Sequence, residues 1–489
     1  MRVIRLLMGI VAIGQAIVTK EWILGLAGGF LLYMALANLG CCCVNSWALL
    51  RGRKWLAPLL LLVFSKALSQ EPAVRLTVDQ AITIALANNK ELKMSTLDEK
   101  IAAARYKETQ GVFLPQVGVS YSAMTTNNPL NAFGFKLQQQ TITAEDFSPV
   151  QLNHPGGTPD FMARADVQQP LVNMDQVYMR KGAAKEVEVY ELKRQRATEG
   201  LVFQVNKAYT QLQLANASVS VWEEALKTAE ALYRYTSDRV DQGFLNKADA
   251  LNAKVQVATT ESRLAEADSQ VKNASDYLSL LMGRPYGTSY TVDSNSMPDM
   301  GAAFTDALVP AGRADLGALQ RAIEASDLGI RSRKLSALPR LNAFGSYQLN
   351  DSRMFNFGAN AYMAGIQLSW DIFKGNSIRN KIATQTLERN RLAEELSLRK
   401  DESNLELNKA QRQLADARYR IRQQEAAAAS AAEAFRILKD RYEQGLAGST
   451  DVLLAQTQLS QQQLALAQAI FDHRVVIAYI QFLTTGSTK

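Results

Sequence analysis

The stretch that decides the fold is residues 376–444, NSIRNKIATQTLERNRLAEELSLRKDESNLELNKAQRQLADARYRIRQQEAAAASAAEAFRILKDRYEQ. It contains neither proline nor glycine, the two residues that most strongly interrupt a helix. As one continuous helix it would extend roughly 100 Å, at about 1.5 Å per residue. A helix of that length exceeds those of ordinary globular domains, so the stretch predicts a coiled coil.

Mostly apolar residues recur within it in alternating steps of three and four, the spacing of a coiled-coil seam. The seam is formed by Leu407, Ala410, Leu414, Ala417, Ile421, Gln424, Ala428, Ala431 and Phe435. The same steps occur 202 residues earlier, at Val205, Ala208, Leu212, Ala215, Val219, Trp222, Leu226, Ala229 and Tyr233. Two return seams, from Val257 to Leu281 and from Leu459 to Leu483, keep the same displacement. A register held this long predicts an internal duplication.

Segments with a period of two precede each long helical stretch. We predict strands at 113–124 and 161–171 in the first copy, and at 340–350 and 361–371 in the second. One apolar and one polar face suit a membrane β-barrel, and they suit a half-buried soluble sheet equally well. Four strands do not close a barrel, and an open edge is not tolerated in lipid. A membrane sheet would therefore pool strands from several chains.

The domain boundaries follow from this duplication. The first repeat covers 70–285, with a helical hairpin at 174–283, and the second covers 313–489, with a hairpin at 376–485. Residues 286–312 form the linker between the repeats. Residues 126–160 are rich in Asn, Gln, Pro and Gly and join the first two strands, which predicts an extracellular loop.

The N-terminal 69 residues have the pattern of membrane and export sequence. Residues 1–50 contain two apolar stretches and weakly resemble a small two-helix inner-membrane module. The alternative is a leader whose assigned start lies upstream of the true one. Residues 51–69 combine a basic start, an apolar centre and a small-residue end, as a signal peptide does. The mature chain is then expected to begin near Gln70 or Glu71. This export signal favours the membrane interpretation of the strands.

Charge and composition exclude several classes of function. The net charge is +7, but the first 69 residues hold seven basic side chains and one acidic one, so the body is close to neutral. No surplus remains for a nucleic-acid surface. The chain has two histidines, three adjacent cysteines at 41–43 and no phosphate-binding glycine loop. We therefore predict no enzyme, no cofactor and no metal site.

The two helical hairpins reverse at DRVDQGFLNKADAL (238–251) and DRYEQGLAGSTDVL (440–453). Each has an arginine, a glycine four residues later, then Phe or Leu, and an aspartate six residues after the glycine. Glycine ends helices and acidic residues favour helix starts, so capping accounts for part of this pattern. Recurring at this spacing, it resembles the TolC-type outer-membrane efflux family. The segments Leu76-Thr-Val-Asp-Gln-Ala81 and Phe113-Leu-Pro115 extend the resemblance, which covers residues 75–485.

The resemblance implies a mainly α-helical protein with membrane β-structure. Three chains would form a homotrimer whose twelve pooled strands make one barrel in outer-membrane lipid, continued through the periplasm by a helical coiled-coil barrel. It also implies roles for seven residues. Gly243, Phe244, Gly445 and Leu446 would be the tips that a periplasmic adaptor protein docks on, while Asp249, Asp451 and Tyr442 would belong to the periplasmic aperture and its gate.

Two positions depart from the family pattern. Ala447 stands where a basic latch residue is usual, and Leu454 replaces a second aperture aspartate. Asp451 has the alternative role of a helix cap.

The predicted function is a passive outer-membrane exit channel of a tripartite efflux system of the RND type, or of a type I secretion system. It would connect through the adaptor to an inner-membrane transporter. The alternative is a periplasmic coiled-coil adaptor or scaffold. The exported substrate is not encoded in any motif.

Overall fold

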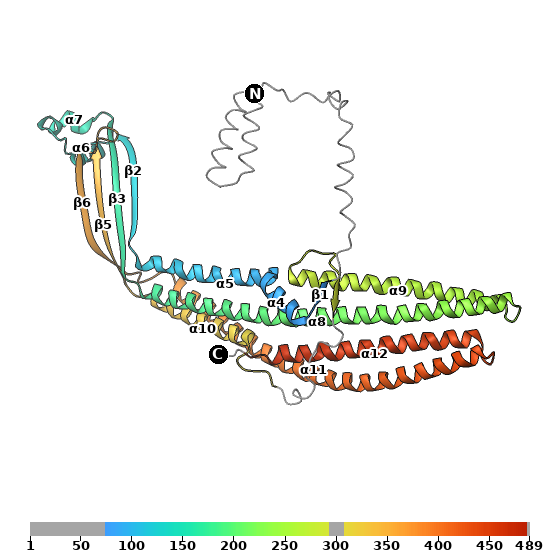
Figure 1. Ribbon diagram of the computed structural model, residues 1–489. Coiled ribbons are helices and arrows are strands. Elements are labelled where there is room, and N and C mark those ends of the chain that lie inside the picture. The colour runs from blue at the N-terminus through green and yellow to red at the C-terminus, as the bar shows by residue number, and fades with distance from the viewer. Residues whose placement is uncertain (1–73, 293–307, 487–489) are drawn as a thin grey trace, which may run out of the picture. The chain divides into compact units, whose positions relative to one another are not determined.

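The computed structural model describes residues 74–292 and 308–486 (Figure 1). The chain divides into two units, Met1–Glu71 and Pro72–Lys489, and the description concerns the second. The predictions for residues 1–69 lie outside the described residues, as does part of the predicted linker.

Both halves of this unit follow the same order of short helix, strand pair, long helix and return helix. The first half comprises α4 (Val78–Asn88), α5 (Lys90–Glu108), β2 (Gln116–Thr126), β3 (Thr158–Val172), α8 (Met174–Asp241) and α9 (Lys247–Met282). The second comprises α10 (Ala314–Leu335), β5 (Arg340–Asp351), β6 (Ala359–Ser369), α11 (Ser377–Glu443) and α12 (Ser449–Thr484). The mainly helical fold with four longer strands agrees with the prediction. In Figure 1 the sheet continues from one end of the helices, and both hairpin tips lie at the other.

The long helices α8 and α11 contain 68 and 67 residues, and each packs against a return helix of 36 residues. Val205, Ala208 and Leu212 of the predicted seam are buried. Toward the tip Ala229 of the predicted seam is buried, but the buried residues on either side of it are Ala225 and Leu232, whereas the prediction had Leu226 and Tyr233. An α-helix has 3.6 residues per turn, so a strict 3.5-residue seam drifts around it unless the helices supercoil.

The helices α4, α5 and α10, which precede the strands, were not predicted. The junction between α4 and α5 is set by a single side chain. The side chain of Asn89 accepts a hydrogen bond from the Leu92 backbone N–H and starts α5 directly after α4. Its amide also donates to the Leu281 carbonyl on α9, at 2.9 Å. Beside this junction, β1 (Val74–Leu76) pairs in parallel with β4 (Tyr290–Val292), which lies in the predicted linker.

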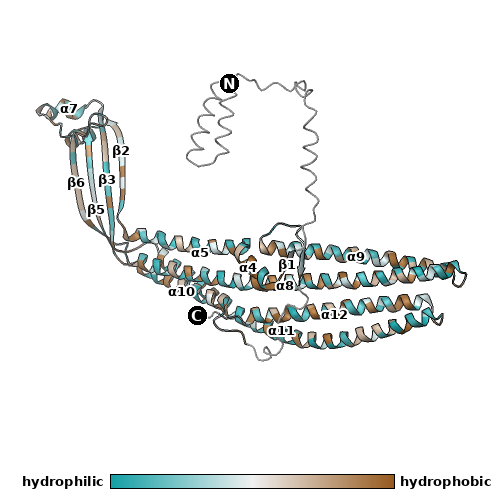
Figure 2. Ribbon diagram, viewed as in Figure 1, coloured by the Kyte–Doolittle hydropathy of each residue, from teal (hydrophilic) through white to brown (hydrophobic). Residues whose placement is uncertain are grey.

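The four-stranded sheet has the order β2-β3-β5-β6, and every neighbouring pair is antiparallel. Its register aligns the predicted apolar sets: Val119 lies opposite Ala165, Ala165 opposite Tyr347, and Tyr347 opposite Tyr362. Polar and apolar residues are interleaved along the strands (Figure 2). Because side chains alternate between faces, the apolar residues of all four strands share one face.

The strand limits differ from the predicted ones at the sheet ends. Residues Thr109–Phe113 form a 3-10 helix, so β2 begins at Gln116 and not at 113. The register shifts near Pro170, which cannot donate to a neighbouring strand. The segment 126–160, predicted as a loop, contains α6 (Pro129–Gln138), a 3-10 turn (Ala144–Phe147) and α7 (Pro149–Asn153).

One ion pair holds this segment together. The Lys136 ammonium lies 2.5 Å from a carboxylate oxygen of Asp146, which also accepts the Thr143 backbone N–H at 2.8 Å. These bonds, chiefly the one from Lys136, lower the pKa of Asp146 from 3.8 to about 2. The segment is therefore expected to keep its fold well into the acidic range.

The apolar face of the sheet is exposed in the single chain. Val119 is 80 % exposed and Tyr362 is 84 % exposed, on the two edge strands. Exposing large apolar side chains to water is unfavourable, so a contiguous exposed apolar patch indicates a surface that contacts protein or membrane. Among the described residues, none of the helices combines enough length with enough apolar character to cross a bilayer.

Candidate functional site

The tip of the first hairpin is built around Gly243. Helix α8 ends at Asp241, and Gly243 takes a left-handed conformation with φ of +80°. Its N–H donates to the Val240 carbonyl at 2.9 Å, and the Phe244 N–H donates to the Arg239 carbonyl at 2.8 Å. This pair of bonds is the Schellman ending of a helix, which favours glycine at the left-handed residue.

The tip of the second hairpin repeats this geometry. Gly445 has φ of +76°, its N–H donates to the Tyr442 carbonyl at 2.9 Å, and the Leu446 N–H donates to the Arg441 carbonyl at 2.8 Å. Phe244 and Leu446, which follow the glycines, are 69 % and 63 % exposed. The Arg239 guanidinium lies 5.5 Å from the Phe244 ring. Each tip therefore presents one large apolar side chain to its surroundings.

Tyr442 joins the two hairpins just inside the tips. Its side chain is buried at 4 % exposure, and its ring lies 5.4 Å from the ring of Tyr235 on α8. Its hydroxyl lies 2.8 Å from the hydroxyl oxygen of Thr236. The single Thr236 proton is donated to the Leu232 carbonyl, so Tyr442 is the donor of this bond. Burial raises the pKa of Tyr442, which keeps the phenol protonated.

The two aspartates have different surroundings. Asp249 accepts a hydrogen bond from the Ser449 hydroxyl at 3.1 Å, which links the first turn of α9 to the first turn of α12. Asp451 is exposed, and its carboxylate accepts the Gly448 N–H at 3.1 Å. Asp451 is thus a helix cap, and this role leaves its second oxygen available to the solvent. The structure brings Asp249 and Tyr442 to the contact between hairpins, and Asp451 to the outside of the turn.

The two departures from the family pattern have structural counterparts. Ala447 packs against an apolar cluster of Leu232, Tyr442, Val452 and Leu453. Leu454 is exposed beyond that cluster. Near the tips the hairpins are therefore joined by apolar packing and by hydrogen bonds from hydroxyl and amide side chains, with no basic side chain at position 447.

Several polar contacts between the hairpins were not predicted, and three of them lie toward the tips. These involve Thr236, Ser449 and Gln456, whose amide donates to the Ala225 carbonyl at 2.6 Å. Each of these residues is polar and lies where two helices pack together. The only sequence signal for them would have been a polar residue interrupting the apolar seam.

A cavity of about 380 Å³ lies beside Tyr442, between α8 and α11. It leaves room for the helices to repack.

Comparison with known proteins decides the family. Residues 81–284 and 308–472 match the profile of the family described as outer membrane efflux protein. The chain belongs to this outer membrane efflux protein family. The match covers both repeats and both hairpin tips. Family membership confirms the predicted TolC-type resemblance and an outer-membrane location.

Two curated relatives of this efflux protein are similar in part. It is 27% identical over 270 residues to the cation efflux system protein CusC of Escherichia coli K12, which is 54% of either chain. It is 26% identical over 207 residues to the probable outer membrane lipoprotein SilC of Salmonella typhimurium, covering 42% of this chain and 40% of SilC. The chain therefore spans about half the length of the curated relatives it matches.

Solved structures support the fold. A crystal structure of CusC superposes with a TM-score of 0.68 at 19% identity, covering 86% of this chain and 96% of that one. The CmeC outer membrane channel of Campylobacter jejuni gives a TM-score of 0.68 at 16% identity, with 86% and 90% covered. The efflux protein therefore has the fold of these outer-membrane channels, a β-barrel sheet continued by long helices. The family is one of channels and not of enzymes.

Proposed function

We propose that the protein is a passive exit channel in the outer membrane, without catalytic activity, serving a tripartite efflux system. The register of the four-stranded sheet carries this proposal. It places the apolar residues of β2, β3, β5 and β6 on one face and polar residues, including the Arg164–Asp166 ion pair, on the other. Lipid on one side and water on the other is the arrangement that a membrane channel requires.

Three copies of the chain would complete the barrel. The edge strands β2 and β6 lie at opposite ends of a sheet of four alternating strands, so they run in opposite directions. The β2 edge of one copy can therefore pair with the β6 edge of the next in antiparallel fashion. Three copies supply twelve strands, and closure removes the open edges that lipid does not tolerate. This pairing of edges supports the proposed homotrimer.

The hairpin tips would form the gate and the docking site. Tyr442 and Asp249 connect the two hairpins of one chain, and breaking their bonds to Thr236 and Ser449 would let the hairpins separate. The exposed tip residues Phe244 and Leu446 would bind the helical hairpins of a periplasmic adaptor. An adaptor that binds the separated arrangement more tightly shifts the channel toward the open state. The energy for export would come from an inner-membrane transporter that the adaptor joins.

The relatives support an efflux role without identifying the cargo. The name of CusC describes a cation efflux system, and that of SilC an outer membrane lipoprotein. The runner-up, a periplasmic adaptor or scaffold, would not explain an exposed apolar sheet face in a protein of this family. An exit channel explains both the sheet and the helices.

Reconstitution tests the proposal. The purified full-length protein should migrate as a heat-sensitive trimer and should form discrete conductance steps in planar bilayers. A soluble monomer without conductance would contradict the channel and favour the scaffold.

A second test concerns docking. In a Gram-negative host that lacks its own efflux channel, the wild-type protein should raise drug tolerance. The Phe244→Glu and Leu446→Glu double variant should lose that effect while keeping its trimer and its conductance. Leu137→Glu is the matched control, because Leu137 is an exposed apolar residue at the other end of the molecule. Tolerance that survives the double variant would argue against docking at these tips.

A further inference from the structure

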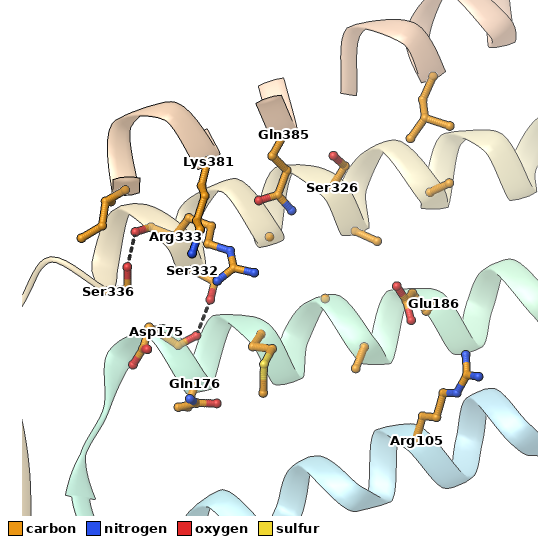
Figure 3. Close-up of a pocket in the computed structure, with 18 of the residues that line it drawn as sticks. Arg105, Asp175, Gln176, Glu186, Ser326, Ser332, Arg333, Ser336, Lys381 and Gln385 are labelled. Carbon is orange, nitrogen blue, oxygen red and sulfur yellow. Dashed lines mark hydrogen bonds between the residues drawn. The ribbon is translucent and has the colours of Figure 1, made fainter. Parts of the chain in front are cut away.

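The largest cavity described lies at the junction between the sheet and the helices. It has a volume of about 800 Å³ and is lined from α5, α8, α10 and α11 (Figure 3). The labelled side chains in Figure 3 include Arg105 from α5, Glu186 from α8, Arg333 from α10 and Lys381 from α11. Neither the gate nor the docking tips use this region.

The order of the helices places the cavity on the inner face of the wall. Helix α8 packs between α5 and α10, and α10 packs between α8 and α11, so the four form consecutive members of one layer. The first and last of these helices, α5 and α11, both contribute side chains to the cavity. A cavity that is lined by side chains from all four helices of one layer lies on the concave side of that layer. In a closed barrel the concave side is the lumen.

The sheet independently places the cavity on the lumen side of the wall. Arg340, which lines the cavity, lies opposite Ser369 on the polar face of the sheet. Asp371 also lines the cavity and follows Ser369 by two residues, which keeps it on the same face of an extended chain. The cavity therefore continues the polar, water-facing side of the sheet downward onto the helices.

The cavity carries an excess of unpaired positive charge. Arg105, Lys193, Arg333 and Lys381 line it and are exposed, and their side chains make no ion pair or hydrogen bond with any described residue. Glu186 is the one lining acid in the same situation. The other lining acids are neutralised: Asp175 lies 2.6 Å from Arg340, and Asp371 lies 2.5 Å from Lys374.

The other face of the same two helices is different. There Lys185 and Arg321 bridge Glu188 and Glu324 at distances between 2.8 and 3.3 Å, so each charge has an opposite partner. Cations without an ion-pair partner also occur elsewhere on these helices, such as Lys207 on α8 and Lys334 on α10, but the cavity gathers four of them on one concave surface. The cavity also has one unsatisfied hydrogen-bond donor. The Nε atom of Arg340 is buried and has no hydrogen-bond partner among the described residues.

We propose that this cavity is a lumen subsite for anionic cargo, meaning small molecules that carry several carboxylate or phosphate groups. This inference rests on the proposed channel function and adds a substrate class to it. A cleft lined by one sign of charge raises the local concentration of the opposite ion by roughly 10-fold to 10³-fold. In a trimer three such subsites would face one another across the lumen. They would favour entry of anions into the barrel.

Planar-bilayer recordings with inorganic tripolyphosphate test the inference. The probe is added on the barrel side only, because the cavity lies at the junction between the sheet and the helices. Tripolyphosphate should block the wild-type channel, and the half-blocking concentration should rise at least about tenfold in the Arg333→Gln and Lys381→Gln double variant. The block should also weaken as the salt concentration rises, since exposed charges are screened.

The chain offers matched controls two residues away on the same helices. Arg331 lies over the Tyr178 ring and Arg379 is exposed, and neither lines the cavity. The Arg331→Gln and Arg379→Gln double variant removes the same charge and should be blocked like the wild type. Equal loss of block in both double variants would show a general charge effect and would overturn the subsite.

The outcomes separate the subsite from the channel itself. Wild-type conductance that tripolyphosphate does not block, or blocks equally in the Arg333 and Lys381 variant, would refute the anion subsite and leave the channel intact. An absence of any conductance would refute the channel function on which the subsite rests. A block that is lost only in the cavity variant would establish both.

Discussion

The contact between Tyr442 and Thr236 provides a direct test of the gate. In the Tyr442→Phe variant the ring keeps its packing against Tyr235, and only the hydroxyl is lost. Thr236 still donates to the Leu232 carbonyl, so no donor is left unsatisfied. The change therefore removes one hydrogen bond of ordinary strength, about 1 kcal/mol.

That free energy shifts the equilibrium between closed and open states. For one chain, about 1 kcal/mol corresponds to a change of roughly fivefold. In a trimer that opens in one concerted step, three lost bonds total about 3 kcal/mol, or roughly a hundredfold. Single-channel open probability in planar bilayers measures this shift. Tyr419→Phe, on an exposed tyrosine of the same helix, should leave the open probability unchanged.

A double-mutant cycle tests whether the two hydroxyls act together. Thr236→Val should raise the open probability by at least the same factor, because it leaves the buried Tyr442 hydroxyl without an acceptor. The Tyr442→Phe and Thr236→Val double variant should not exceed the Thr236→Val variant. An open probability for Tyr442→Phe within twofold of the wild type, in a protein that still forms trimers, would refute this account of the gate. Fully additive effects would show that the two residues act separately.

Three further predictions concern folding. Asp315→Asn leaves the fully buried Arg313 guanidinium without its two-point partner at 2.7 and 2.8 Å, and the free energy of unfolding should fall by about 3 kcal/mol in denaturant titrations. Gly283→Ala should lower the thermal midpoint, because φ is +64° and the new Cβ would lie 2.8 Å from the Asn88 carbonyl oxygen. Gly287 has φ of +85° and open space around it, so Gly287→Ala should lower the free energy of unfolding only by the backbone strain of about 1 to 2 kcal/mol. If Gly283→Ala and Gly287→Ala destabilise the protein equally, the close contact with Asn88 is not the cause. Finally, the segment 126–160 should resist pepsin until the pH falls toward 2, because the lowered pKa of Asp146 adds stability that is present above 3.8 and lost through about 2. In Lys136→Met, cleavage should begin nearer pH 3.8, and an unchanged pH profile would exclude this ion pair as the cause.

Much of the fold could be read from local periodicity. The seam residues Val205 and Leu212 are buried as their spacing predicts, and the alternation along β6 matches the face that holds Tyr362. The glycines that end α8 and α11 were predicted from the tip sequence. All of these depend on residues close together in the chain, where helix and strand geometry leave few choices.

Contacts between distant segments were not predictable in this way. The Tyr442 hydroxyl finds a partner 206 residues away, and the Ser449 hydroxyl one 200 residues away. The sequence marks Tyr442 only through resemblance to a family, and it does not mark Thr236 at all. Which side chains meet between two hairpins depends on their relative rotation and height, and the pattern of a single helix does not contain that information.

The sequence by itself determined the duplicated plan, the long helices, the alternating strands and the reversal points, because each follows from the period of a local pattern. Tertiary structure alone decided where the charges meet. It paired Lys185 and Arg321 with acids on one face, and left Arg333 and Lys381 without partners on the other. In the sequence these four residues are indistinguishable, since each is a cation in a helical segment. The curvature of the helical layer separates them, because it gathers side chains from four helices on its concave side.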